Sequence, residues 1–260
     1  MGQNLAHYEI KNQIAMVTID HPPMNALDAA TKEAIGEVFA ELDARRQEVR
    51  AVILHGAGEK AFAAGADIKA FLELTPDIAK RRLSRSHQIY GMVENFEWPV
   101  IAAIHGFCLG GGLELALCCD IRYAEETAQF GFPEVNLSVF PGNGGMQRSL
   151  YHLPIGKLKE LVYSGEMIDA TEAFRIGLIE KITPPGKAIE GALELAAKMM
   201  TKGPLGIVAA KKVMNRTRDI SLSHGLELES DLWANLTSTK DMIEGAQAFI
   251  EKRKPQYQCE

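Results

Sequence analysis

The sequence has few cysteines, and their positions argue against a covalently cross-linked framework. Four cysteines occur in 260 residues, at Cys108, Cys118, Cys119 and Cys259, and no two have the C-x-x-C spacing. Cys118 and Cys119 are neighbours in an apolar segment, where small buried thiols are normal. We therefore expect no disulfide framework and a reduced, intracellular protein located in the cytoplasm.

The sequence also lacks long runs of basic residues. The 28 lysines and arginines are outnumbered by 34 aspartates and glutamates, which gives a formal net charge of −6. No basic run is longer than three residues, the length of the tripeptide 252–254. A protein that binds nucleic acid usually carries a basic patch or stripe, so we expect no nucleic-acid partner.

No apolar run is long enough to suggest a membrane-spanning helix. The nearest candidate, residues 100–121, is interrupted by His105, Glu114 and Asp120, and a buried strand followed by a buried helix explains it better. The N-terminus has no basic segment followed by an apolar one, as a signal peptide would. Ala6 stands where a myristoylation motif needs Ser or Thr. We expect no membrane partner.

What the sequence does contain is an alternation of short apolar strands with amphipathic helices, which predicts an α/β fold. Hydrophobic and charged contents of 47% and 24% are those of an ordinary globular protein. Helices are expected after Asp28, from Pro76 to about Phe96, over 113–119, and from Met146 and Ile155. The expected strands are 8–11, 14–20, 51–55, 100–104, 120–124, a strand-like link at 165–170, and 177–182.

The last stretch is expected to be entirely helical and to associate with other subunits. Six apolar residues form a face that is too wide to pack on one side: Leu222, Leu226, Leu228, Leu232, Trp233 and Leu236. Such a helix must be buried on more than one side, against its own core or against another subunit. We divide the chain into a core with the active site, 1–200, and a helical oligomerisation region, 201–260.

The chain is organised around the glycine turn Gly110–Gly112. It follows the apolar strand 100–104 and precedes a helix with Glu114 in its first turn. Unpaired N–H groups and partial positive charge gather at a helix start, which suits a group that becomes negative during a reaction. The alternative is a tight turn in which Glu114 only caps the helix. Neither a P-loop nor a dinucleotide fingerprint fits the spacing.

Two other segments combine glycines with an acidic residue. In AFAAGADIKAF, residues 61–71, a loop of small residues leads to Asp67, where a helix is expected to begin. In AQFGFPEVNLSVFPGNGGMQRSL, residues 128–150, Glu134 follows a proline and a second glycine cluster spans 141–145. Taken alone, the first reads as a capped turn and Glu134 as a solvent-facing residue.

Together, these three segments resemble the signatures of the enoyl-CoA hydratase (crotonase) family, in the family's order and approximate spacing, and the resemblance runs from Tyr8 to Gln258. It implies a ClpP/crotonase-like spiral of ββα turns, with C-terminal helices that build homotrimers, commonly paired into hexamers. It also implies an acyl-CoA thioester substrate, no metal and no cofactor, since coenzyme A is part of the substrate. The implied activity is that of a hydro-lyase of fatty acid β-oxidation, which converts a trans-2-enoyl-CoA into a 3-hydroxyacyl-CoA.

The resemblance also implies roles for individual residues. Glu114 would activate water, Glu134 would protonate C2, and the backbone N–H groups of Ala66 and Gly111 would form the oxyanion hole. Lys252 or Lys254 would reach a phosphate, in the same subunit or in a neighbouring one. The implied substrate- and CoA-binding residues are Asn25, Ala26, Leu27, Ala64, Ala66, Asp67, Ile68, Lys69 and Gly111.

Five positions depart from common hydratases, and they bear on acyl preference and on activity: Phe132, Ser138, Val139, Asn143 and Met146. An enoyl-CoA isomerase is the nearest alternative, because it shares the oxyanion hole but needs one carboxylate. An RNA-binding or non-catalytic member of the fold is a further alternative. The presence of both Glu114 and Glu134, together with the net charge, favours the hydratase.

Overall fold

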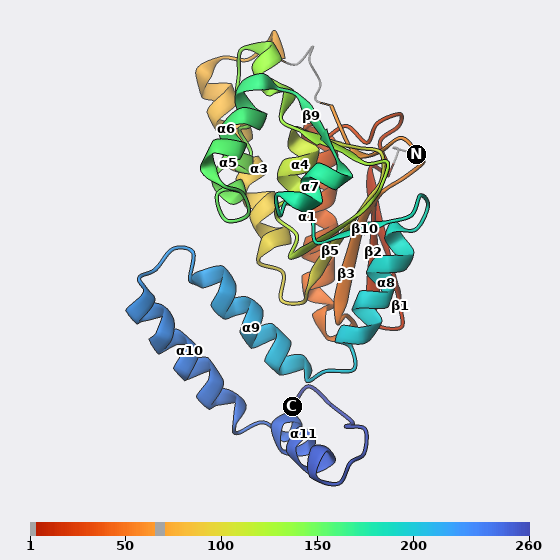
Figure 1. Cartoon of the computed structure of the whole chain (residues 1–260), viewed down its shortest axis with the longest axis vertical. Helices are drawn as coiled ribbons and strands as arrows, with labels where there is room; N and C mark the ends of the chain where they lie inside the picture. Colours follow the sequence, from red (N-terminus) through yellow and green to blue (C-terminus); the bar gives the residue numbers. More distant parts are fainter. Residues whose placement is uncertain (1–3, 66–70) are drawn as a thin grey trace.

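The computed structural model describes residues 4–65 and 71–260, and its centre is a pair of β-sheets (Figure 1). Within the described residues, one sheet has six strands in the order β1-β2-β3-β5-β7-β10 and the other has four in the order β4-β6-β8-β9. β1 in the first sheet and β9 in the second pair antiparallel, and the remaining neighbours are parallel. The larger sheet consists of β1 (Ala6–Lys11), β2 (Ile14–Ile19), β3 (Ala51–Gly56), β5 (Val100–Ile104), β7 (Ile121–Glu125) and β10 (Lys181–Thr183). The smaller one consists of β4 (Ala61–Ala63), β6 (Phe107–Leu109), β8 (Gln129–Gly131) and β9 (Met167–Asp169).

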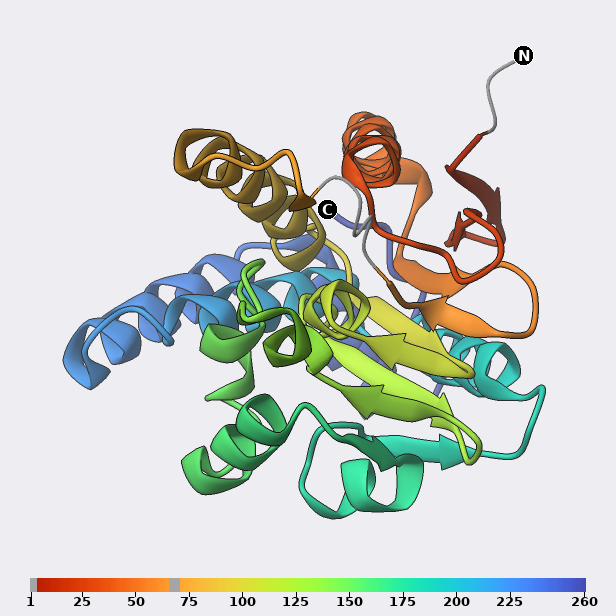
Figure 2. The same ribbon diagram turned by 90° about the horizontal axis from the view of Figure 1, so that it is seen from above.

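Successive strand pairs repeat one unit, in which the first strand joins the larger sheet and the second joins the smaller. The pairs are β3 and β4, β5 and β6, and β7 and β8. Each pair leads to helical structure: α3 (Pro76–Glu94), α4 (Gly111–Ala116), and the short η2 (Pro133–Leu137) with α5 (Gly145–Ser149). Figure 2 shows these turns stacked beside one another, from orange through yellow to green. Because the second strands are parallel, the loops that follow them meet at one edge, and this confirms the predicted ββα spiral.

Helices cover both faces of the larger sheet. α1 (Ala29–Ala44) is capped by Asp28, whose carboxylate accepts the Thr31 N–H, and it buries Ile35, Phe39 and Leu42 against α3 and β1. α8 (Ala188–Met199) covers the opposite face with small alanines, which allows it to pack closely on β3, β5 and β7. The other helices before the C-terminal region, among the described residues, are η1 (Arg46–Glu48), α6 (Ile155–Ser164) and α7 (Ala170–Arg175).

Most predicted elements are confirmed to within a few residues, but two predictions differ more, and β4, β6 and β8 of the smaller sheet were not predicted. The strand expected at 177–182 is wrong over most of its length, because β10 covers Lys181–Thr183. Leu178 and Ile179 are instead buried in the turn after α7, where the Leu178 N–H bonds to the Ala173 carbonyl. The helix expected over 113–119 begins at Gly111 and ends at Ala116. The helix expected from Asp67 falls within 66–70, outside the described residues.

The C-terminal helices extend away from the sheets (Figure 1). They are α9 (Pro204–Arg216), α10 (Leu222–Leu236) and α11 (Lys240–Ile250). α10 packs on α9 with Leu228, Leu232 and Leu236 half-buried, whereas Leu222 and Trp233 are 79% and 69% exposed. One chain therefore covers a single side of α10. In the part of the chain that the structure describes, no helix has the length and apolar character needed to cross a membrane.

Candidate active site

The glycine turn joins β6 to α4 and brings the helix start unusually close to β4. A Cβ added to Gly112 would lie 1.9 Å from the Ala63 carbonyl oxygen, and Gly110 has φ +52°, so each position requires glycine. Gly111 is the first residue of α4, and its carbonyl accepts the Tyr90 hydroxyl at 3.0 Å. Its N–H makes no hydrogen bond to any other described residue. The turn is thus structurally necessary and also presents a donor at a helix start.

Glu114 is fully buried, and three N–H groups of the loop before α5 hold its carboxylate. The backbone N–H groups of Asn143 and Gly145 donate to Oε1 at 2.7 and 3.0 Å, and Asn143 Nδ2 donates to Oε2 at 2.6 Å. Hydrogen bonds to a carboxylate are about twice as strong as those between neutral groups. The arrangement therefore fixes the carboxyl group of Glu114 in place.

Glu134 lies in different surroundings at the same turn. Proline at the first position of η2 places this residue so that a Cβ added to Gly110 would be 2.8 Å from Glu134 Oε1. Its Oε2 is buried and has no hydrogen-bond partner among the described residues. Burial, assisted by the nearby charge of Glu114, raises the pKa of Glu134 to about 7. This carboxyl group can hold a proton near neutral pH.

The third segment supplies the wall behind Glu114. A Cβ added to Gly145 would lie 2.6 Å from Glu114 Cγ and 2.9 Å from Phe132 Cε1, so glycine is needed there. Phe132 is fully buried at this point, which explains how a residue without a polar group fits before the Pro-Glu pair. Ser138 adopts the left-handed conformation that ends η2, and Val139 is exposed. Met146 is half-buried against the core.

The residues expected to bind coenzyme A lie beside this turn, but several of their polar groups are already engaged. The Asn25 amide donates to the carbonyls of Ala57 and Ala61 and accepts the His21 N–H, so its side chain joins two segments. The Ala26 carbonyl is bonded to His21 Nδ1, and the Ala64 N–H donates to the Met24 carbonyl.

The rest of this set is apolar or not described. Leu27 is buried, and one of its methyl groups would lie 3.9 Å from a Cβ added to Gly111. Ala66, Asp67, Ile68 and Lys69 lie outside the described residues, so the second oxyanion donor is not placed.

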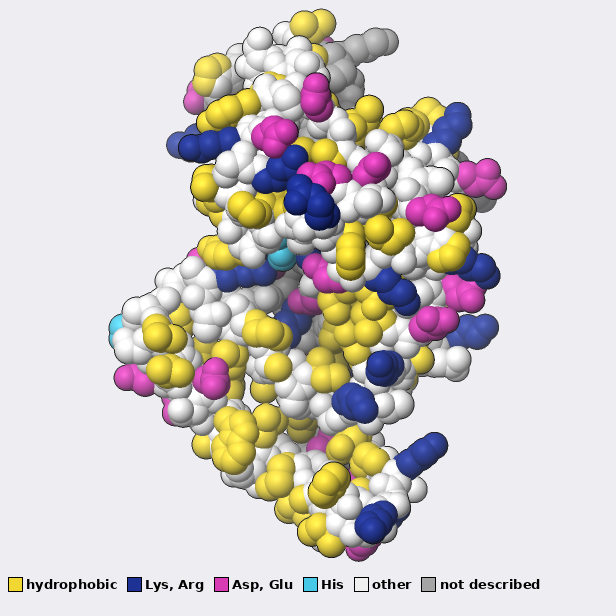
Figure 3. Space-filling model, viewed as in Figure 1, with side chains coloured by type: hydrophobic (Ala, Val, Ile, Leu, Met, Phe, Trp, Pro, Cys, Tyr) yellow, Lys and Arg dark blue, Asp and Glu magenta, His cyan; other side chains and the backbone are white. Residues whose placement is uncertain are grey.

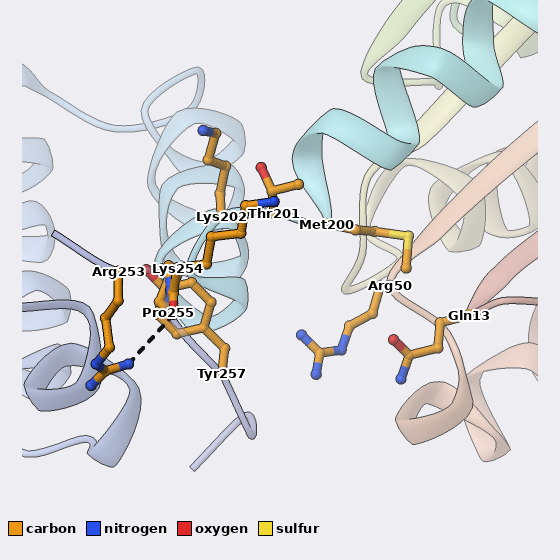
Figure 4. Close-up of a pocket in the computed structure, with 9 residues that line it drawn as sticks. All are labelled: Gln13, Arg50, Met200, Thr201, Lys202, Arg253, Lys254, Pro255 and Tyr257. Atoms are coloured by element: carbon orange, nitrogen blue, oxygen red, sulfur yellow. Dashed lines mark hydrogen bonds between the residues drawn. The ribbon is translucent and has the colours of Figure 1, made fainter. Parts of the chain in front are cut away.

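Lys254 lines a basic pocket together with Gln13, in the turn between β1 and β2, and Met200, at the end of α8. The pocket has a volume of about 560 Å³, and Arg50, Lys202 and Arg253 are also among the residues that line it (Figure 4). Arg253 is paired with Glu244 and Glu251, and Lys252 is exposed nearby. Within one chain neither lysine lies near Glu114, so a contact with the same substrate would need a second subunit.

Sequence reasoning missed Lys32 altogether and gave Asn143 no role. Lys32 lies on α1, and its Nζ reaches Asn143 Oδ1 at 3.3 Å. The two residues are 111 positions apart, so no local pattern connects them. The one available signal was that Asn143 stands in the glycine cluster where common hydratases have alanine.

Comparison with known proteins agrees with the geometry. The family model described as "Enoyl-CoA hydratase/isomerase" matches residues 9–260. The short-chain-enoyl-CoA hydratase of Clostridium acetobutylicum is 39% identical over 255 residues, which cover 98% of this chain and 97% of that protein. The crotonyl-CoA hydratase of Syntrophomonas wolfei is 36% identical and covers 96% of each chain.

Solved structures extend the agreement to three dimensions. The enoyl-CoA hydratase of Bacillus anthracis superposes with a TM-score of 0.93 at 37% identity, covering 99% of this chain and all of that one. An enoyl-CoA hydratase of Geobacillus kaustophilus gives a TM-score of 0.95 at 25% identity. The fold and the resemblance predicted from the sequence are both confirmed, and the chain belongs to the enoyl-CoA hydratase/isomerase family.

Proposed function

We propose that this protein is an enoyl-CoA hydratase that adds water across the 2,3 double bond of a trans-2-enoyl-CoA to give a 3-hydroxyacyl-CoA. The observation that carries the proposal is the contrast between two carboxyl groups at one glycine turn. Three N–H donors hold the carboxyl group of Glu114, while burial raises the pKa of Glu134 to about 7. A base and an acid side by side are what the addition of water requires.

In the proposed reaction, Glu114 takes a proton from water as the water oxygen forms a bond to C3. The electron pair of the double bond moves to C2 and the thioester oxygen, and the Gly111 N–H stabilises the resulting negative charge. Glu134 then delivers its proton to C2. Loss of one oxyanion donor typically lowers a rate by about 10²–10³. The proton on Glu114 passes to Glu134 or to solvent before the next turnover, so atoms and charge balance.

By the resemblance, the Ala66 N–H supplies the second oxyanion donor, and coenzyme A extends past Asn25–Leu27 and 64–69. Carbonyls and N–H groups of these segments are better suited to the ligand than the Asn25 side chain, which already makes three hydrogen bonds. The reaction drawn here needs no metal and no cofactor. Among the described residues, no cluster of His, Cys, Asp and Glu has the geometry to hold a metal ion.

We further propose that the chain forms homotrimers, alone or paired as hexamers, and acts in fatty acid β-oxidation in the cytoplasm. Figure 3 shows hydrophobic side chains gathered over the C-terminal helices. Trp233, Phe249 and Ile250 are each more than two-thirds exposed, and a partner subunit would bury them. Three buried cysteines and one half-buried cysteine, all free, are compatible with a reducing compartment. A monomer in sedimentation at micromolar concentration would contradict the trimer.

The function is tested with EDTA-treated protein and a panel of straight and branched enoyl-CoAs. We expect loss of absorbance at the enoyl-thioester band with crotonyl-CoA and formation of the 3-hydroxyacyl product. A failure on short, long and branched substrates alike would contradict the hydratase proposal. Double-bond migration without water addition would favour the isomerase instead.

A further inference from the structure

A chain of hydrogen bonds connects helix α1 to Glu114. Lys32 Nζ donates to Asn143 Oδ1 at 3.3 Å and to Ser86 Oγ at 3.1 Å, and Asn143 Nδ2 donates to Glu114 Oε2 at 2.6 Å. Lys32 is half-buried, and Ser86 is 5% exposed. Burial lowers the pKa of Lys32, and the charges of Glu114 and Asp28 counteract this effect. A charged group in such a site needs partners, and the structure supplies them.

The two ends of the chain fix the orientation of the Asn143 amide. A lysine ammonium group can only donate hydrogen bonds, and an ionised carboxylate can only accept them. The amide must therefore turn its oxygen toward Lys32 and its nitrogen toward Glu114. The Asn143 backbone is also held, because its carbonyl accepts Arg148 Nη1 at 3.1 Å. Rotation of the amide would place a donor against Lys32 and an acceptor against Glu114.

This orientation determines which part of Glu114 remains open. A carboxylate has about four acceptor positions, two on each oxygen. The backbone N–H groups of Asn143 and Gly145 occupy both positions on Oε1, and the Asn143 amide occupies one on Oε2. The remaining position is on Oε2. A Cβ added to Gly111 would lie 3.9 Å from Asn143 Nδ2, so the amide is next to the oxyanion donor as well.

We propose that Asn143 and Lys32 are positioning residues for the base, which leave one acceptor position on Glu114 Oε2 as the place where the proton of the attacking water is received. Asn143 acts directly on the carboxylate, and Lys32 acts through Asn143. The inference rests on the proposed role of Glu114 in hydration. It goes beyond that role because it identifies Oε2 as the oxygen of Glu114 that receives the proton, and Asn143 and Lys32 as the residues that hold this oxygen in position.

The kinetic test compares Asn143→Ala, Lys32→Met and the double variant with the wild type on crotonyl-CoA. We expect Asn143→Ala to lower kcat by roughly 10- to 100-fold and Lys32→Met by roughly 5- to 10-fold, with KM within about twofold of the wild type, because ground-state binding is untouched. The double variant should be no slower than Asn143→Ala, since Lys32 acts through the amide. Lys159→Met, which removes an exposed lysine on α6 outside this chain of hydrogen bonds, is the matched control and should keep kcat within about twofold.

Multiplicative losses in the double variant, near-wild-type rates in both single variants, or losses confined to KM would each overturn the inference. Wild-type turnover separately tests the proposed function. A second double-mutant cycle does not depend on catalytic turnover. It compares the melting temperatures of Lys32→Met, Glu114→Gln and the variant that carries both substitutions. If the chain couples the two charges, Lys32→Met should destabilise the Glu114→Gln protein less than the wild type. Additive shifts in melting temperature would overturn the coupling whether or not the protein hydrates crotonyl-CoA.

Discussion

Glu114 and Glu134 are the same residue type at the same turn, but the structure gives them opposite surroundings. Glu114 lies in the first turn of α4 and accepts three hydrogen bonds from a loop about 30 residues further along the chain. Glu134 lies in η2, and its buried Oε2 has no hydrogen-bond partner among the described residues. Three N–H donors hold the first carboxyl group, whereas burial raises the pKa of the second to about 7.

The difference shows that the surroundings of a glutamate, rather than its residue type, determine whether it acts as a base or as an acid. Donated hydrogen bonds favour the carboxylate form, and burial without donors favours the protonated form. Two identical side chains can therefore act as base and acid at one pH, with a proton on one of them. The comparison is best tested by variants that change Glu114 or Glu134, or the surroundings of one of them, one at a time.

The largest effect is expected from neutralising either carboxyl group. Glu114→Gln and Glu134→Gln should each lower kcat for crotonyl-CoA hydration by more than about 10²-fold with KM little changed, because Gln cannot exchange a proton near neutral pH. The double variant should be far less impaired than the product of the two losses, since both groups serve one water. Near-wild-type turnover by either single variant would contradict the two-glutamate mechanism and favour an isomerase-like use of one carboxylate.

Glu114→Gln should also lower the melting temperature, and Glu134→Gln should not. The hydrogen-bond pattern around Glu114 consists entirely of N–H donors, so the Gln amide nitrogen must face a donor in either orientation. Glu134 has no such donors at its Oε2. Equal melting temperatures for the two variants at neutral pH would mean that the contrast in surroundings has no energetic consequence.

A smaller loss is expected when a methyl group is added beside one carboxyl group. Gly145→Ala would place Cβ 2.6 Å from Glu114 Cγ and should displace the base, lowering kcat by about 10-fold or more. Gly110→Ala would place Cβ 2.8 Å from Glu134 Oε1 and also strain a backbone with φ +52°. Gly156→Ala, where nothing lies within 4 Å of the added Cβ, is the control. A normal kcat for Gly145→Ala would show that Glu114 tolerates displacement.

Much of this site could be predicted from the sequence, because the positions of its glycines indicate where the backbone turns sharply and packs closely. The turn at Gly110–Gly112 needs glycine for close packing on β4, and Pro133 sets the start of η2, so the motifs carry geometric information. The strands of the larger sheet and most helices followed from period and caps, whereas β4, β6 and β8 of the smaller sheet, each three residues long, were not predicted. The bounds of β10 did not, because Leu178 and Ile179 are as apolar as a strand but are buried in a turn.

What could not be predicted depends on contacts between distant segments. Lys32 and Asn143 meet across 111 residues, and Asn143 could be noted only as unusual. The raised pKa of Glu134 likewise results from burial by several segments, which no single motif reports. The sequence thus identified Glu114 and Glu134, whereas the contact of Lys32 with Asn143 and the raised pKa of Glu134 required the assembled structure.

A dependence of activity on pH should follow from the pKa of Glu134. That pKa is about 7, so kcat/KM for hydration should fall as pH rises through about 7, where the pair loses its shared proton. Dehydration of the 3-hydroxyacyl-CoA should show the same limb, because both directions need one proton on the pair. Rate–pH profiles in both directions check this. A hydration rate that stays level to pH 9 would contradict Glu134 as the acid.

The smallest effect concerns stability, and its sign follows from the same pKa. The pKa of Glu134 rises from 4.5, its ordinary value, to about 7 on folding, so between these pH values the folded protein holds a proton that the unfolded chain has released. Wild-type stability should therefore fall as pH rises from about 4.5 to about 7, and this contribution should then level off. Gln at 134 has no proton to lose, so it escapes the penalty.

The melting temperature of Glu134→Gln should accordingly exceed that of the wild type by more at pH 8 than at pH 5, by a few degrees at most for a chain of this length. Glu126→Gln, at an exposed position, is the control and should show no such change with pH, because solvent surrounds that side chain before and after unfolding. Thermal unfolding of the three proteins at both pH values measures the difference. A constant offset would mean that Glu134 is already ionised at pH 5 in the folded protein, and the acid would then have to be sought elsewhere at the turn.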